Sequence, residues 1–121
     1  MKSPRYHVIV DLTHAKPDVI RDQSRLEQFL KDIVTRVEMK IISGPTAVQG
    51  VPENPGLSAF AVLDYSHAAV HTFTEHDEVM IDIFSCKPFD REKARQAVLE
   101  TFATPESDVR SQEIWWQSQT V

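Results

Sequence analysis

The sequence predicts an α+β protein, a two-layer sandwich in which two helices cover one face of an antiparallel sheet. Two segments carry apolar residues at helical spacing, and the segments between them are rich in β-forming residues that alternate in polarity. The expected order is strand, helix, four strands, helix and strand, with no internal repeat. Because the later central strands follow one another through short turns, antiparallel pairing is expected.

The first strand and the first helix have distinct patterns. Residues 6–12 alternate apolar and more polar side chains with the period of a strand. Ser24 and Glu27 form a capping-box pattern, which predicts a helix that begins at Ser24. The apolar residues that should form its buried stripe are Leu26, Phe29, Leu30, Ile33, Val34 and Val37.

The middle of the chain is interpreted as strands around one long loop. Residues 39–43 predict a strand, whereas residues 44–56 contain three glycines and three prolines, which is typical of a mobile loop. Three short β-rich runs follow at residues 57–63, 67–74 and 79–86, as expected for a meander of antiparallel strands.

The last part of the chain predicts a second helix and a final strand. Asp90 is the expected N-cap of this helix, and Pro105 should stop it. Residues 109–116 are the candidate for the last strand. The residues expected on the buried face of the helix are Ala94, Ala97, Val98 and Phe102.

Length and composition exclude several classes of protein. A chain of 121 residues has the length of one domain, so residues 1–121 are interpreted as a single domain. The net charge is −5 and the basic residues are scattered, which argues against nucleic-acid binding. The apolar run at residues 8–10 is too short for a signal peptide or a membrane span. A cytoplasmic protein without membrane contact is therefore expected.

The run 79–86 has two different faces. One face is aliphatic, with Val79, Ile81 and Ile83, and suits a core covered by helices. The other face combines apolar side chains with a carboxylate and a thiol, from Met80, Asp82, Phe84 and Cys86. Because a monomer rarely exposes a large apolar patch, a ligand or a second subunit should cover this face. A homodimer with its site near this face is therefore expected.

The sequence does not predict a metal site. His67 and His71 lie four positions apart, which on a strand separates them by about 13 Å, so they cannot bind one ion. Cys86 is the only cysteine, which excludes an intrachain disulfide and a multi-cysteine zinc site. Its role must be that of a packed residue or of a working thiol.

A segment in the middle of the chain carries a more specific signal. It comprises PGLSAFAVL at residues 55–63, SHAAVHTFTE at residues 66–75 and IDIFSC at residues 81–86. In this order and spacing, with Ser66, His71 and Cys86 as the fixed points, the segment resembles the prokaryotic S-adenosylmethionine decarboxylase family. That family consists of pyruvoyl-dependent, self-processing proenzymes. The resemblance extends over nearly the whole chain through its length and element order.

The resemblance implies that the peptide bond between Tyr65 and Ser66 breaks by self-processing, which yields a beta chain (1–65) and an alpha chain (66–121). Ser66 would become a pyruvoyl group, the only cofactor implied, with no metal or pyridoxal phosphate. The implied enzyme is a carboxy-lyase of polyamine (spermidine) biosynthesis that binds its substrate amine as a Schiff base. The family usually has glutamate where this chain has Tyr65, but any residue there supplies the carbonyl that the serine hydroxyl attacks.

The resemblance also implies roles for other residues. His71 would be the base for elimination, Ser58 would assist processing, and Cys86 would protonate the product carbon. For the substrate, Glu75 would hold the ribose and Phe73 would stack on the adenine. The position of the family's second stacking aromatic falls on Pro52, which has no ring.

Two alternatives stay open. The missing ring at Pro52 favours a smaller amine, so pyruvoyl chemistry on ornithine or arginine is the first alternative. The second is an inactive homologue that regulates an active decarboxylase. The sequence argues against this second alternative, because it retains four groups that a pure binding role would not need, namely Ser66, His71, Ser58 and Cys86.

Overall fold

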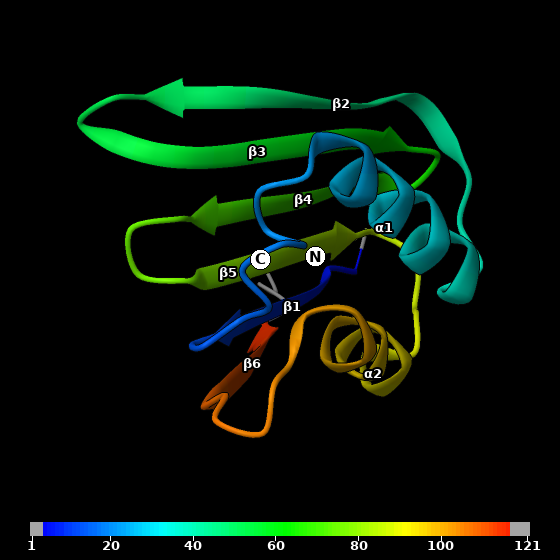
Figure 1. Cartoon of the computed structure of the whole chain (residues 1–121). Helices are drawn as coiled ribbons and strands as arrows, with labels where there is room; N and C mark the ends of the chain where they lie inside the picture. Colours follow the sequence, from blue (N-terminus) through cyan, green and yellow to red (C-terminus); the bar gives the residue numbers. More distant parts are fainter. Residues whose placement is uncertain (1–3, 117–121) are drawn as a thin grey trace.

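The computed structural model describes residues 4–116, which form a six-stranded antiparallel sheet with two helices on one face (Figure 1). The predicted fold class and element order are confirmed. The spatial order of the strands is β2-β3-β4-β5-β1-β6, so the first strand lies between the fifth and the sixth. The elements are β1 (Tyr6–Leu12), α1 (Gln23–Arg36), β2 (Ile41–Val51), β3 (Asn54–Leu63), β4 (Ser66–Phe73), β5 (Glu78–Ser85), α2 (Arg91–Phe102) and β6 (Val109–Trp115).

The hydrophobic core lies between the helices and one face of the sheet. The apolar stripe predicted for α1 is buried, and the four residues predicted for α2 are buried as well. Phe29 of α1 and Phe102 of α2 meet edge to face at 4.8 Å between ring centroids, which joins the two helices within this core. In β5, Val79, Ile81 and Ile83 face this core, as the two-sided pattern of that strand predicts.

The prediction of a loop at residues 44–56 is wrong, because most of this segment forms the long hairpin of β2 and β3. β2 is an edge strand that pairs only with β3, and an edge strand tolerates proline and glycine where the register shifts. One shift lies between Ser43 and Thr46, at Gly44 and Pro45, and another lies at Gly50. Only the tip of the hairpin, Pro52 and Glu53, is a turn.

The start of the first helix also differs from the prediction. α1 begins at Gln23, and its N-cap is Asp22, whose side chain accepts a hydrogen bond from the Arg25 amide at 3.2 Å. Glu27 does not complete a capping box, because its carboxylate accepts a hydrogen bond from the Ala47 amide of β2 at 2.9 Å. The predicted N-cap of α2 is confirmed, since Asp90 accepts a hydrogen bond from the Lys93 amide at 3.1 Å.

One face of the sheet is covered by neither helix, and we call it the open face. Ser58, Phe60 and Val62 of β3 lie on it, as their exposure alternates with the buried residues between them. It continues over β4 and β5 through half-buried side chains that include His71 and Phe84. Within residues 4–116, no helix is long and apolar enough to cross a membrane.

Candidate functional site

A tight turn presents Ser66 at the start of β4. Asp64 and Tyr65 form this turn, and Ser66 pairs with Leu63 of β3 on one side and with Ser85 of β5 on the other. The turn is also tied to the segment that follows α1. The Asp64 amide donates to the Lys40 carbonyl at 2.9 Å, and the Asp64 carboxylate accepts from the Lys40 amide at 3.0 Å. Asp64 therefore ties the tip of the β3–β4 hairpin to Lys40, which lies outside the hairpin.

Two features of the peptide bond between Tyr65 and Ser66 bear on its reactivity. The Tyr65 carbonyl oxygen accepts a hydrogen bond from the Cys86 amide at 3.0 Å, which polarises the carbonyl and favours negative charge on the oxygen. Ser66 has a φ of +145°, a conformation that residues with a side chain rarely adopt. Such a conformation costs on the order of 1–3 kcal/mol and is often found at functional sites. A polarised carbonyl thus adjoins a strained serine.

A second turn brings Cys86 to this bond. Ser85 is fully buried, and its hydroxyl accepts from the Lys87 amide and donates to the Lys87 carbonyl, both at 2.9 Å. These bonds close the chain around Cys86, whose side chain is exposed just beyond β5. The role of Ser85 was not predicted. A serine before Lys87 and Pro88 is a turn signal of the kind that could have indicated it.

Two other predicted residues form a separate pair on the open face. Ser58 of β3 lies opposite His71 of β4, and the Ser58 hydroxyl and His71 Nδ1 are 2.8 Å apart. Ser58 is exposed and His71 is half-buried, so solvent or a ligand can reach the pair. An imidazole and a hydroxyl at this distance can exchange a proton.

The structure brings Ser66 close to Cys86 and Ser58 close to His71, but it does not bring these two groups together. Ser66 and His71 belong to the same strand and lie five positions apart. At about 3.3 Å per residue, their Cα atoms are separated by about 16 Å. A single chain therefore holds two separate half-sites, one at each end of β4.

The predicted substrate residues lie at the end of β4 that carries His71. Phe73 ends this strand, is half-buried, and shares the open face with His71 by alternation. Glu75 is exposed in the turn between β4 and β5. Pro52 is exposed at the tip of the β2–β3 hairpin and offers no aromatic ring.

An aromatic ring that was not predicted as a site residue lies near Ser58. Phe60 is 50% exposed on the open face, two residues along β3, and stacks on His67 at 5.4 Å between ring centroids. The alternation of Ser58, Phe60 and Val62 in the sequence is the signal that places this ring beside Ser58.

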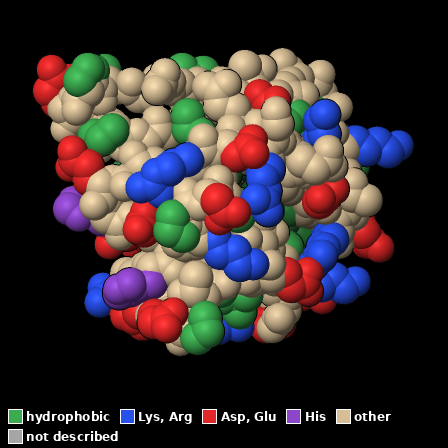
Figure 2. Space-filling view, in the orientation of Figure 1, with side chains coloured by type: hydrophobic (Ala, Val, Ile, Leu, Met, Phe, Trp, Pro, Cys, Tyr) green, Lys and Arg blue, Asp and Glu red, His purple; other side chains and the backbone are tan. Residues whose placement is uncertain are grey.

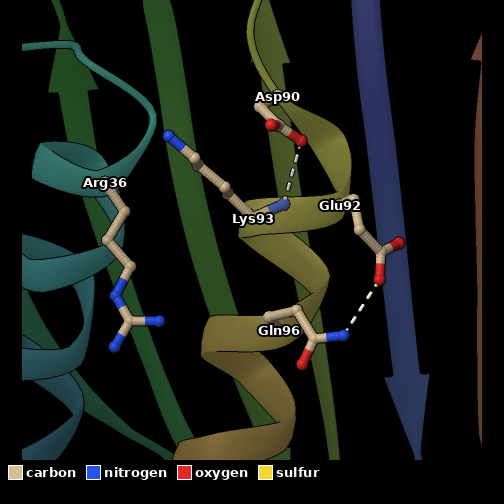
Figure 3. Close-up of a pocket in the computed structure, with 5 residues that line it drawn as sticks. All are labelled: Arg36, Asp90, Glu92, Lys93 and Gln96. Carbon is tan, nitrogen blue, oxygen red and sulfur yellow. Dashed lines mark hydrogen bonds between the residues drawn. The ribbon is translucent and has the colours of Figure 1, made fainter.

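A pocket of about 380 Å³ lies on the helix side of the sheet, away from the open face (Figure 3). Arg36 at the end of α1 and residues around the start of α2 line it, and none of the predicted site residues does. The hydrogen bond from Arg36 to Glu100 at 2.6 Å raises the pKa of Arg36 and lowers the pKa of Glu100. Arg36 is therefore already paired and does not offer this pocket an unneutralised cation.

Surface charge on the helix side does not define another site, and neither do metal ligands among the residues described. Figure 2 shows the helix side of the molecule, where acidic and basic side chains are intermixed without a large patch of one sign. In the described part of the chain, no three His, Cys, Asp or Glu side chains are grouped so that they could hold a metal ion. The two half-sites on β4 are thus the candidates for chemistry.

Known proteins resemble this chain over most of its length. Residues 6–113 match the family described as S-adenosylmethionine decarboxylase. Two examples come from relatives named "S-adenosylmethionine decarboxylase proenzyme". The protein of Thermodesulfovibrio yellowstonii is 29% identical over 79% of this chain and 70% of its own length. The protein of Archaeoglobus fulgidus is 29% identical over 84% of this chain and 88% of its own length.

The fold has a counterpart among solved structures. The crystal structure of the adenosylmethionine decarboxylase from Aquifex aeolicus superposes with a TM-score of 0.72, covering 98% of this chain and 97% of that chain at 22% identity. This likeness confirms the sandwich of sheet and helices. The family match spans residues 6–113 of the 121. The chain therefore belongs to the S-adenosylmethionine decarboxylase family.

Proposed function

We propose that this chain is a proenzyme that cuts itself between Tyr65 and Ser66 and then decarboxylates S-adenosylmethionine. The contact that carries the proposal is the hydrogen bond of 3.0 Å from the Cys86 amide to the Tyr65 carbonyl, beside a serine with a φ of +145°. The amide stabilises the oxyanion that forms when this carbonyl is attacked. The strained backbone raises the energy of the bond that has to break.

The first step moves the acyl group from nitrogen to oxygen. The Ser66 hydroxyl oxygen attacks the Tyr65 carbonyl carbon and loses its proton, the bond between that carbon and the Ser66 nitrogen breaks, and the nitrogen takes up a proton. An ester then joins Tyr65 to the Ser66 side chain. The chain stays connected, and the Cys86 amide remains beside the carbonyl oxygen of Tyr65.

The second step needs a base. Removal of the Ser66 α-proton breaks the bond between Cβ and Oγ, so Tyr65 leaves as a carboxylate and residue 66 becomes dehydroalanine. Its enamine form tautomerises to an imine, and water hydrolyses this imine to a ketone with release of ammonia. His71 is the proposed base, but it lies about 16 Å from Ser66 in the same chain, by the rise of a strand.

This separation favours a homodimer in which the open faces of two chains meet. A two-fold axis would place the Ser58–His71 pair of one protomer against Ser66 and Cys86 of the other, and would form two equal sites. The open face suits burial, because apolar side chains of β2 and β3 are exposed there. Val48 is 60% exposed, Phe60 50% and Val62 39%.

After processing, the chain's own residues would bind the substrate and deliver a proton. A pyruvoyl group supplies a ketone that condenses with a primary amine and accepts the electrons released when carbon dioxide leaves. The exposed Cys86 thiol, next to residue 66, is the proposed proton donor to the product carbon. Phe73 and Glu75 would hold adenine and ribose.

A second candidate function uses the same chemistry on a smaller substrate. Pro52 is exposed at a hairpin tip and has no aromatic face, which favours an amine without a base to stack, such as ornithine or arginine. Such a substrate would not need Phe73. The proposals therefore differ in what they require of that ring.

The self-processing proposal predicts two fragments, residues 1–65 and a C-terminal piece that begins with a pyruvoyl group. Intact-mass measurement of the purified protein should find both, with ammonia lost from residue 66. Ser66→Ala removes the attacking hydroxyl and should leave one intact chain with an unchanged circular dichroism spectrum. A wild-type chain that stays intact would indicate the inactive regulatory homologue instead.

The strain at Ser66 predicts an unusual order of stabilities for two variants that cannot be processed. Glycine adopts a φ of +145° without steric cost, whereas alanine does not. Ser66→Gly should therefore be more stable than Ser66→Ala by about 1 kcal/mol, although glycine is normally the less stable residue in a strand. Urea unfolding of both variants measures the difference. The reverse order would show that the serine is not strained.

The shared site predicts complementation between two inactive variants. In a mixed dimer of Ser66→Ala and His71→Ala chains, one site lacks both groups and the other keeps both. Co-expression should therefore cut the His71→Ala chain and restore roughly a quarter of wild-type carbon dioxide release, since half of the dimers are mixed. The control pairs Ser66→Ala with the double variant Ser66→Ala/His71→Ala, which leaves no serine to process. A completely inactive mixture would show instead that Ser66 and His71 of the same chain act together in one site.

The substrate proposal predicts a specific effect of the ring at Phe73. Stacking on a base contributes about 1–3 kcal/mol, so Phe73→Leu should raise the KM for S-adenosylmethionine about tenfold or more. Phe73→Tyr keeps the ring and is the matched control. Carbon dioxide release from S-adenosylmethionine, ornithine and arginine should be compared for all three proteins. Faster turnover of ornithine or arginine, unaffected by Phe73→Leu, would support the second function.

A further inference from the structure

Lys87 contacts the residue that precedes the proposed cleavage point. Its ammonium lies 5.1 Å from the centroid of the Tyr65 ring, within the distance of about 6 Å at which a cation is attracted to an aromatic face. The neighbouring residue in the chain, Cys86, donates its amide to the Tyr65 carbonyl. Two consecutive residues therefore hold Tyr65, one at its carbonyl and one at its ring.

The Lys87 ammonium is itself fixed in position. It donates a hydrogen bond to the Glu38 carbonyl oxygen at 2.9 Å. Glu38 follows the end of α1 in a left-handed conformation, with a φ of +62°, and its amide donates to the Thr35 carbonyl at 3.0 Å. The cation is thus anchored on an ordered helix end rather than on a free side chain.

Tyr65 lies in an exposed turn, where the contact with Lys87 restrains its ring. Its side chain is 41% exposed at the tip of a two-residue turn. Rotation about the N–Cα bond of Tyr65 would move the ring and the carbonyl group together and take the carbonyl oxygen away from the Cys86 amide. A cation over the ring opposes this rotation, because the ring would have to leave the cation when the carbonyl turns.

We propose that Lys87 is a positioning residue for self-processing, which it promotes by holding Tyr65 so that the carbonyl stays on the Cys86 amide while Ser66 attacks. This inference rests on the proposed function.

The contact determines which residues can precede the cleaved bond efficiently. An ammonium is attracted to an aromatic ring and, more strongly, to a carboxylate, but not to an aliphatic side chain. Position 65 should therefore accept phenylalanine and glutamate and reject leucine. Lys87 should accept arginine, which also places a cation over a ring, and reject methionine.

The test follows the cleavage of newly synthesised chains over time in a cell-free translation reaction, on denaturing gels. Lys87→Met and Tyr65→Leu should each slow cleavage about tenfold, whereas Lys87→Arg and Tyr65→Phe should cut at close to the wild-type rate. The double variant Lys87→Met/Tyr65→Leu should be no slower than either single variant. Chains that have been cut should show wild-type carbon dioxide release per processed site, since Lys87 is not proposed to touch substrate.

A stability control separates positioning from folding. Lys87→Met in the Ser66→Ala background should unfold at the same temperature as Ser66→Ala alone, within about 4 °C. Wild-type rates in Lys87→Met would overturn the role of Lys87 and leave self-processing standing. A loss of cleavage that Lys87→Arg fails to rescue, or that follows a lower unfolding temperature, would also overturn it. A wild-type chain that never cuts would end both proposals together.

Discussion

The register of β4 between β3 and β5 is the constraint on which the rest of the site depends. Ser66 pairs with Leu63 and Ser85, and from there each residue of β4 follows its partners without a shift. A slip of one residue would turn the small side chains of β4 toward solvent and His71 toward the helices. Burial of Ala68, Val70 and Thr72 under the helices therefore also fixes where Ser66 meets the Cys86 segment.

The same register separates the groups that the proposed chemistry needs. A strand is straight and nearly extended, so the serine at its start and the histidine near its end cannot approach each other in one chain. The sheet instead places Ser58 and His71 on its open face and Ser66 beside the Cys86 segment at the start of β4, so a second copy in the opposite orientation could complete each half-site. A fold that leaves one face of its sheet uncovered is suited to a site formed in this way.

Much of this architecture could be predicted from periodicity, and the failures have physical causes. The stripe of α1 and the two faces of β5 depend on side-chain patterns that the sequence states directly. A strand was predicted at residues 39–43, but its continuation to Val51 in the edge strand β2 was missed because proline and glycine, which disrupt central strands, are tolerated at its bulges. Asp22 was missed because Ser24 offered a competing cap, whose partner Glu27 is used by β2 instead.

The candidate site could be predicted as a set of side chains but not as an arrangement. Ser66, His71 and Cys86 were singled out because their spacing resembles that of the family, and Ser58 was implied by the same resemblance. The pairing of Ser58 with His71 follows once the register is known. The contribution of Cys86 through its backbone amide has no signature in the sequence, because every residue except proline has that amide. The contact between Lys87 and Tyr65 joins residues that only the sheet brings together.

The strand order has a consequence for a chain that is cut in two. Residues 1–65 contain β1, β2 and β3, and the remainder contains β4, β5 and β6, yet β1 lies between β5 and β6. The two pieces would be interleaved, and Phe29 and Phe102 would join them in a shared core. Before the cut, folding is an event within one molecule; afterwards, unfolding is a dissociation whose reversal depends on the concentration of both pieces. The timing of the cut would therefore decide whether this protein can refold.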